Sequence, residues 1–244
     1  MAEAWALSAA RGALPVPCSR FKRLPGLCRR QYVTGEVIKM IRNIVFDMGN
    51  VLVMYDPVRV CRAYTQKEEE VEWIRRELFD SEEWILLDQG ALTEEEAMER
   101  VRRRLPDERL RALADRCMEE WHIHNIEPRP GMEELVRELK DMGLGIYLCS
   151  NASRRLRVYE SRLPGSRYFD GTIVSAEEGV LKPDAAIYKR LFEKYSLCPE
   201  ECFFIDDLPA NIEGARACGM DGYCFSDGDT QRLRTCLMER LGRA

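Results

Sequence analysis

The chain has 244 residues, of which 45% are apolar and 32% charged, so its composition is that of a globular protein with one ordinary domain or two small ones. No apolar run approaches the ~20 residues that a membrane-spanning helix needs, which argues against an integral membrane protein. The net charge of −5 divides into +5 for residues 1–39 and −10 for the remainder. Because an acidic body lacks the basic stripe of a nucleic-acid surface, we expect neither nucleic acid nor membrane as a partner.

Residues 1–39 are rich in arginine, contain proline and show no hydrophobic periodicity. Three interpretations remain open for them: a disordered tail, a transit-like targeting segment, or a misassigned start. Met40 stands directly before an expected buried strand, as a start at that residue would require. On all three interpretations we expect the segment to add nothing to the core.

The first predicted element is a buried strand at residues 44–46, an apolar run that stops at Asp47. Gly49 and Asn50 behind it signal a sharp turn. The block at residues 58–127 is helical in its apolar spacing, heavily charged and without a convincing strand pattern. We therefore expect an all-helical insertion after the first strand.

Beyond the insertion, short apolar runs alternate with helical patterns and with glycine and proline breaks. Strands that are apolar on both faces and alternate with helices indicate a parallel sheet in an α/β fold. We expect strands at 146–149, 172–174, 202–205 and 223–225, a helix ahead of the second of these, and helices at 132–142, at 185–195 and from residue 209.

Polar residues gather at the expected carboxyl ends of these strands, which is where parallel sheets bind ligands. Taken alone, each is an ordinary turn residue, helix cap or surface lysine. Together, three carboxylates, a hydroxyl and a lysine on one rim suit a hard cation such as Mg²⁺ and a phosphate. The candidate site residues are Asp47, Ser150, Asn151, Lys182, Asp206 and Asp207.

Four ordered motifs at these positions resemble those of the haloacid dehalogenase superfamily, over about residues 41–225. The resemblance implies a Rossmann-like parallel sheet flanked by helices, formed by residues 40–57 and 128–244, with residues 58–127 as a small helical cap. Within the superfamily, the motifs resemble those of bacterial α-glucose-1-phosphate phosphatases, and the fourth also resembles that of the phosphatase domain of soluble epoxide hydrolases. The four motifs are Phe46–Leu52, Cys149–Asn151, Leu181–Asp184 and Phe204–Asn211.

The resemblance also implies a chemistry. Asp47 would be the nucleophile that attacks phosphorus and forms an aspartyl-phosphate intermediate. Mg²⁺ would be held by the Asp47 carboxylate, the backbone carbonyl of Gly49 and Asp207, with Asp206 in or near the coordination sphere, and would neutralise charge on the transferring group.

The resemblance assigns phosphate binding to three further residues. Ser150 would donate a hydrogen bond to a phosphoryl oxygen, and Lys182 would pair with both Asp47 and the phosphate. Asn151 would assist through its backbone or its side chain. The expected partner is a small phosphorylated substrate, and the chain is expected to act as a monomer or a homodimer.

One residue departs from the family pattern. The usual phosphatases of the family carry at the position of Gly49 an aspartic acid that protonates the leaving group, and such help is worth ~10²–10⁴ in rate. Without it we expect a preference for good leaving groups, and so for anomeric sugar, acyl or aryl phosphates over alkyl phosphates. Asp56 is either a substitute acid or a turn residue. Residues 87–90 are either a substrate-reading cap loop or the tip of a helical hairpin.

Three functions from different classes remain open on the sequence. The leading one is a Mg²⁺-dependent phosphatase of a small metabolite, with an anomeric sugar phosphate favoured. The others are a metal-independent dehalogenase-type hydrolase and a catalytically silent binding or regulatory module. The ten cysteines are scattered and form no C-x-x-C pair, as in the reduced thiols of a cytoplasmic protein.

Overall fold

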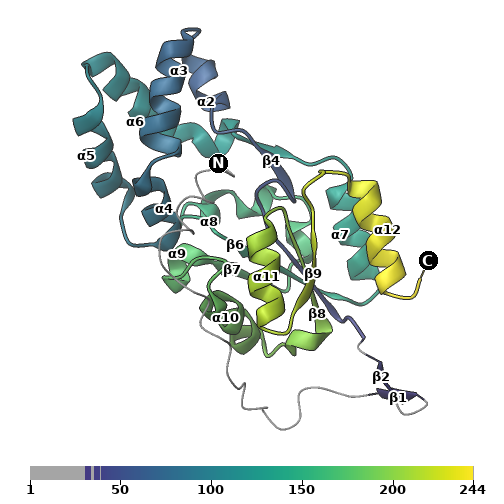
Figure 1. Ribbon diagram of the computed structural model, residues 1–244. Coiled ribbons are helices and arrows are strands. Elements are labelled where there is room, and N and C mark those ends of the chain that lie inside the picture. The colour runs from purple at the N-terminus through teal and green to yellow at the C-terminus, as the bar shows by residue number, and fades with distance from the viewer. Residues whose placement is uncertain (1–30, 34–35, 39, 244) are drawn as a thin grey trace.

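The computed structural model describes residues 31–33, 36–38 and 40–243. At its centre lies a five-stranded, fully parallel sheet with the strand order β7-β6-β3-β8-β9 (Figure 1). The predicted strands are confirmed within a few residues, the last one beginning two residues early and ending before Phe225. Their bounds are β3 (Asn43–Phe46), β6 (Gly145–Ser150), β7 (Gly171–Val174), β8 (Cys202–Asp206) and β9 (Asp221–Cys224).

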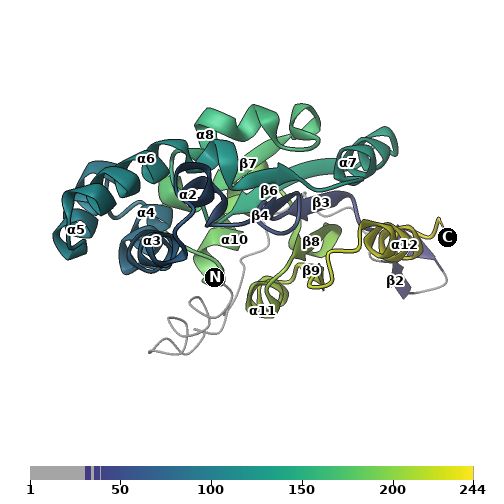
Figure 2. The same cartoon turned by 90° about the horizontal axis from the view of Figure 1, so that it is seen from above.

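Helices cover both faces of this sheet, because successive strand side chains point to opposite sides and both sides are apolar. Ile44 and Phe46 of β3 pack into one hydrophobic cluster, and Val45 between them packs into another. Figure 2 shows the two helical layers from above. The first layer holds α7 (Met132–Asp141), α8 (Leu156–Tyr159) and α12 (Thr230–Arg240), and the second α10 (Ala185–Tyr195) and α11 (Pro209–Ala217).

The segment ahead of β7 contains less helix than the sequence predicts. α8 has four residues and is followed by 3-10 turns at Glu160–Arg162 and Ser166–Tyr168. Pro164 and Gly165 end the helical path, since proline lacks the backbone donor and Gly165 adopts a positive φ of 73°. A short helix, α9 (Ser175–Glu178), follows β7.

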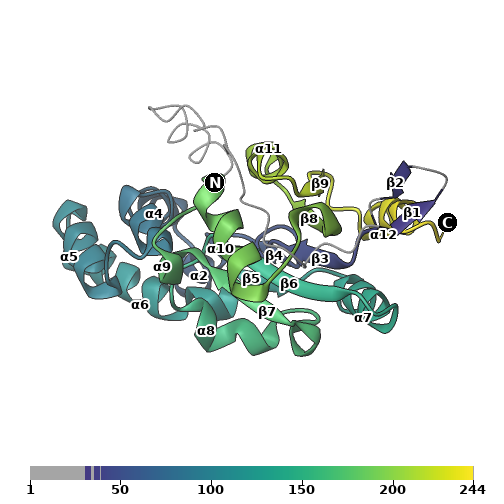
Figure 3. The same cartoon turned by 90° about the horizontal axis from the view of Figure 1, so that it is seen from below.

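Between the first two strands of the sheet, the chain forms a helical cap, residues 59–124. In all three views the cap lies to one side of the sheet, beyond the carboxyl end of β3 (Figures 1, 2 and 3). A π-helical stretch at Arg75–Phe79 continues the second cap helix. The cap helices are α2 (Arg59–Tyr64), α3 (Glu68–Ile74), α4 (Glu82–Gln89), α5 (Glu94–Arg104) and α6 (Glu108–His124).

The two chain crossings between sheet domain and cap run side by side. β4 (Val53–Tyr55) leads into the cap and β5 (Ile126–Pro128) leads out, and they pair as antiparallel strands. The buried side chain of Asn125 joins the crossings, because its Oδ1 accepts a hydrogen bond from the Val60 amide at 2.8 Å and its Nδ2 donates one to the Pro57 carbonyl at 3.1 Å.

Most of the N-terminal segment 1–39 lies outside the described residues, so its three interpretations stay open. Its described part forms a two-stranded antiparallel sheet of β1 (Gln31–Val33) and β2 (Glu36–Ile38). Across the part of the chain that the structure describes, no helix combines the length and apolar character needed to cross a membrane.

Candidate active site

The carboxyl ends of three neighbouring strands form the floor of the site. β3 lies between β6 and β8, so the chain adds strands on opposite sides of β3, and this change in strand order opens a crevice for a ligand. Asp47 directly follows β3, Ser150 ends β6 and Asp206 ends β8. Asp47, Ser150 and Asp207 line a cavity of about 110 Å³ at this edge of the sheet.

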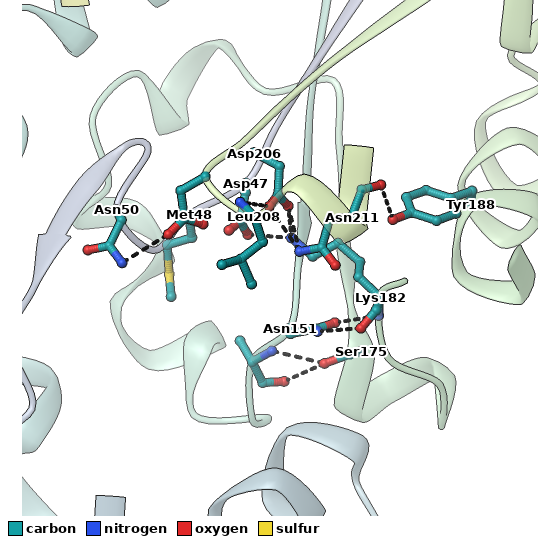
Figure 4. Close-up of polar contacts among 12 residues, drawn as sticks. Asp47, Met48, Asn50, Asn151, Ser175, Lys182, Tyr188, Asp206, Leu208 and Asn211 are labelled. Atoms are coloured by element: carbon teal, nitrogen blue, oxygen red, sulfur yellow. Dashed lines mark hydrogen bonds and ion pairs between the residues drawn. The ribbon is translucent and has the colours of Figure 1, made fainter. Parts of the chain in front are cut away.

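Lys182 joins two of the carboxylates. Its Nζ lies 2.7 Å from Oδ1 of Asp47 and 2.7 Å from Oδ2 of Asp206 (Figure 4). The lysine side chain is only 1% exposed. The sequence placed Lys182 on a loop far from both aspartates in the chain, and the fold brings the three side chains into direct contact.

Asp206 is almost fully engaged with neighbouring donors. Besides Lys182, its carboxylate accepts hydrogen bonds from Nδ2 of Asn211, at 2.9 and 3.1 Å, and from the Leu208 amide at 2.9 Å. In Figure 4 these donors surround the carboxylate. Asp206 therefore orients the ammonium of Lys182. Asn211 is the last residue of the fourth motif, but its role could not be predicted from the sequence.

The charges of the site depend strongly on burial. Burial raises the pKa of Asp47 to about 7, although the ammonium of Lys182 opposes this. Burial also raises the pKa of Asp207. Burial alone would lower the pKa of Lys182, but the attraction of Asp206 and Asp47 outweighs it and raises this pKa above its ordinary value. The lysine therefore stays charged. Its single positive charge does not balance the negative charge of the carboxylates.

The three aspartates could hold a divalent cation. Asp47, Asp206 and Asp207 each offer a carboxylate oxygen, and these oxygens all lie within 4.8 Å of one another. Nδ2 of Asn50 donates to Oδ2 of Asp207 at 3.1 Å and so fixes that side chain. Three carboxylates against one lysine, with the Gly49 backbone at the same cavity, form a set of hard oxygen donors that fits Mg²⁺.

Ser150 and Asn151 differ in what their side chains do. Ser150 is buried and lines the cavity. The amide of Asn151 is bound to the Lys182 backbone, accepting from its N–H at 2.8 Å and donating to its carbonyl at 3.0 Å. The side chain of Asn151 thus holds the lysine loop in place (Figure 4). Assistance of Asn151 to phosphate binding, through its backbone or its side chain, stays a prediction.

A family model of the haloacid dehalogenase-like hydrolases matches residues 41–219. The chain belongs to this family. It is therefore a hydrolase, and the fold expected from the four motifs is confirmed: a parallel sheet flanked by helices, with a helical insertion.

Two curated relatives are phosphate-ester hydrolases by name. The chain is 28% identical over 201 residues to the sesquiterpene phosphatase astK of Aspergillus oryzae, which covers 79% of the chain and 92% of that protein. It is 30% identical over 147 residues to flavin mononucleotide hydrolase 1 of Arabidopsis thaliana, which covers 60% of the chain and 58% of that protein.

A solved structure of the family has the same fold. The haloacid dehalogenase family enzyme bt-2542 of Bacteroides thetaiotaomicron, crystallised with magnesium and inorganic phosphate, superposes with a TM-score of 0.62 at 22% identity. The match covers 79% of this chain and 98% of the bacterial one.

Aromatic rings from the cap and from the elements next to it line part of the cavity in this haloacid dehalogenase-like hydrolase. Trp84 and Trp121 come from cap helices, and Tyr55 and Tyr159 from β4 and α8. The ring of Trp121 contacts the other three edge-on, with centroids at 5.2 Å from Trp84, 5.6 Å from Tyr159 and 6.3 Å from Tyr55. Sequence reasoning missed these walls, because aromatic residues at helical spacing resemble ordinary core residues.

The cap also contributes a carboxyl group. Asp88, near the end of α4, lines the same cavity as Asp47 and is buried at 7% exposure. The sequence left residues 87–90 open between a substrate-reading loop and a hairpin tip, and the structure places Asp88 at the cavity.

Asp56, the acid considered from sequence, is placed differently. It is not among the cavity-lining residues, and its side chain is 39% exposed. Its Oδ1 accepts a hydrogen bond from the Val58 amide at 3.1 Å, and its Oδ2 lies 3.7 Å from Nε of Arg59. Asp56 is thus the turn residue before the first cap helix, which was the second of its two interpretations.

Proposed function

We propose that the chain is a Mg²⁺-dependent phosphomonoesterase that acts on a small phosphorylated metabolite through an aspartyl-phosphate intermediate. The observation that carries this proposal is the buried contact of Asp47 with Lys182, in which Asp47 is one of three clustered carboxylates. A carboxylate held by an ammonium, beside a set of cation ligands, suits attack on a phosphate dianion.

In this proposal each residue at the sheet edge has a separate task. Asp47 attacks phosphorus with a carboxylate oxygen. Lys182 and Ser150 hold phosphoryl oxygens, so that the substrate enters an anion site with one ammonium and one hydroxyl donor. Asp206 and Asn211 keep the ammonium of Lys182 aimed at Asp47.

Mg²⁺ would be held by the Asp47 carboxylate, the Gly49 carbonyl and Asp207. When bound, it would offset the charge of the carboxylates and of the transferring phosphoryl group. The bacterial enzyme of the same fold that was crystallised with magnesium and phosphate supports this assignment. In this arrangement Asp206 contributes negative charge near the cation but does not coordinate it, since its oxygens already accept hydrogen bonds.

The substrate in this proposal is small and has an apolar face on its leaving group. A cavity of about 110 Å³ admits no macromolecule, and the rings around Trp121 favour stacking or apolar contact. A sugar phosphate, with the anomeric isomer favoured by Gly49, remains our first substrate class, and the two named relatives add a terpenoid phosphate and flavin mononucleotide as comparisons. We further propose a monomer or homodimer in the cytoplasm.

The test is phosphate release from a panel that contains glucose 1-phosphate, glucose 6-phosphate, farnesyl phosphate, flavin mononucleotide and an aryl phosphate. We expect release with Mg²⁺, loss of release after chelation, and recovery when Mg²⁺ is restored. No release from any member would favour a catalytically silent module. Halide release from a 2-haloacid without added metal would instead favour the dehalogenase alternative.

A further inference from the structure

Asp88 is a buried carboxyl group for which phosphate binding has no use. It lies on the cap side of the cavity, while Asp47, Ser150 and Lys182 lie on the sheet side. Among the described residues that line the cavity, Lys182 is the one basic side chain, and it is already paired with two aspartates. Asp88 therefore has no cation at the cavity to neutralise it.

The position of Asp88 is fixed through its backbone. The hydroxyl of Ser175 donates a hydrogen bond to the Asp88 carbonyl and accepts one from the Ala152 amide at 2.9 Å. One side chain thus ties the end of α4 to the loop that follows Ser150. In this way the Ser175 hydroxyl holds the end of α4, which carries Asp88, beside the sheet edge.

The surroundings of Asp88 favour its neutral form. Burial raises its pKa well above the ordinary value, a backbone hydrogen bond from Ser153 opposes this, and the charge of Asp47 raises the pKa further. A phosphate dianion in the cavity would act in the same direction as Asp47. These surroundings therefore favour the protonated form of Asp88, which is the form that can donate a hydrogen bond.

Other titratable groups face Asp88 from each neighbouring element. Tyr55 of β4 and Tyr159 of α8 both interact with its charge. The charged side chains around these two tyrosines pair with other residues. Arg155 pairs with Glu94, Arg162 donates to the His122 carbonyl, and the α9 acids Glu177 and Glu178 pair with Arg157 and with Arg190 and Lys194.

In-line displacement places the leaving oxygen on the side of phosphorus opposite the nucleophile. Asp47 lies on the sheet side, so the leaving oxygen faces the cap, and Asp88 is the carboxyl that the cap presents there. We propose that Asp88 is the general acid of this hydrolase and replaces, from the cap, the acid that Gly49 does not provide. This inference rests on the proposed phosphatase function. It removes the preference for good leaving groups, and so for the anomeric isomer, that a missing acid at Gly49 would otherwise cause.

The proton balance of the step is complete. As an oxygen of Asp47 bonds to phosphorus, the phosphorus–oxygen bond to the leaving group breaks and Asp88 transfers its proton to the departing oxygen. Water then attacks the aspartyl phosphate, Asp88 takes a proton from that water, and Asp47 is released with phosphate. One water is consumed, and an alcohol and phosphate are formed.

The test compares Asp88→Asn with the wild type on phosphate monoesters that differ in leaving-group pKa, at fixed Mg²⁺ and pH. The amide keeps the shape of the side chain but carries no transferable proton. We expect kcat/KM for alkyl phosphates to fall by about 10²–10⁴-fold, with a much smaller loss for aryl phosphates of acidic phenols. The matched control is Asp56→Asn, whose amide can keep the turn and which should leave the leaving-group dependence unchanged.

A uniform loss across the series, or no loss, would overturn the role of Asp88 while leaving the phosphatase function standing. A wild type that releases phosphate from no monoester would overturn both. A second readout needs no turnover: the infrared difference between wild type and Asp88→Asn at neutral pH should contain the carbonyl band of a protonated carboxylic acid. A carboxylate band in its place would also overturn the proposal.

Discussion

Gly90 and Ala176 are in backbone contact between cap and sheet domain: a β-carbon added to Gly90 would lie 2.2 Å from the Ala176 carbonyl oxygen. Gly90→Ala must therefore push α4 away from α9. We expect the proposed phosphatase activity to fall by a larger fraction than the free energy of unfolding. Gly143→Ala is the matched control, because Gly143 has a similar positive φ, 84° against 74°, but open space around it. Equal effects of the two variants on activity would argue against a role for the contact.

Asp88 also makes stability depend on pH. Because burial raises its folded-state pKa, the folded protein binds more protons than the unfolded chain above the ordinary pKa of about 3.9. The contribution of Asp88 to stability is therefore full at low pH and falls as pH rises toward the folded-state pKa. We expect Asp88→Asn to unfold at a higher temperature than wild type at pH 7, with the gain shrinking toward pH 4, in thermal melts between those values.

The buried ion pair of Lys182 predicts a large stability effect. Lys182→Met leaves Asp47 and Asp206 without their cation, and removing one partner of a buried pair costs about 3–5 kcal/mol. Lys140→Met is the control, since Lys140 pairs with Asp170 at 2.6 Å near the surface, where such a pair is worth about 0–1 kcal/mol. Urea unfolding of both variants checks the difference. Similar losses would contradict the structural role of Lys182.

The nucleophile is tested by Asp47→Asn. An amide cannot attack phosphorus, so turnover should be lost, while the side chain keeps its size and the fold its circular dichroism. Rapid quenching with radiolabelled substrate should show label on the wild-type protein and none on the variant. Wild-type activity of purified Asp47→Asn would falsify the aspartyl-phosphate mechanism.

Asp207→Asn tests the cation site. The change removes one charged oxygen ligand and leaves the contact with Asn50 possible through the amide oxygen. We expect the Mg²⁺ concentration for half-maximal activity to rise at least about tenfold. Titration calorimetry of the metal-depleted proteins with Mg²⁺ should show a matching loss of affinity. An unchanged requirement would place the cation elsewhere.

The sheet side of the site followed from the sequence for a physical reason. Parallel strands end at one edge, so residues that follow Phe46, Cys149 and Ile205 had to meet there. The observed strand bounds differ most from the expected ones at β9, which begins with Asp221 and Gly222. Neither residue has the apolar character by which a buried strand is recognised.

The residues on the cap side of the site could not be predicted from the sequence in this way. Asp88 and Trp121 reach the cavity because the cap docks onto the sheet domain, and docking depends on contacts such as Ser175 with the Asp88 carbonyl. Periodicity shows that α4 and α6 are helices but not which face meets the substrate. The role of the Asn151 side chain was likewise hidden, since its partner is the backbone of a distant loop.

The bridge that Asn125 makes between the two chain crossings has a consequence for turnover. Because β4, β5 and Asn125 join the two crossings, we expect any movement of the cap relative to the sheet domain to turn about this joint. The ion pair of Arg155 with Glu94 and the Ser175 contact also join the cap to the sheet domain. Because Asp88 belongs to the cap, such a movement would carry the proposed proton donor away from Asp47, so we expect proton transfer only while the cap is docked on the sheet domain.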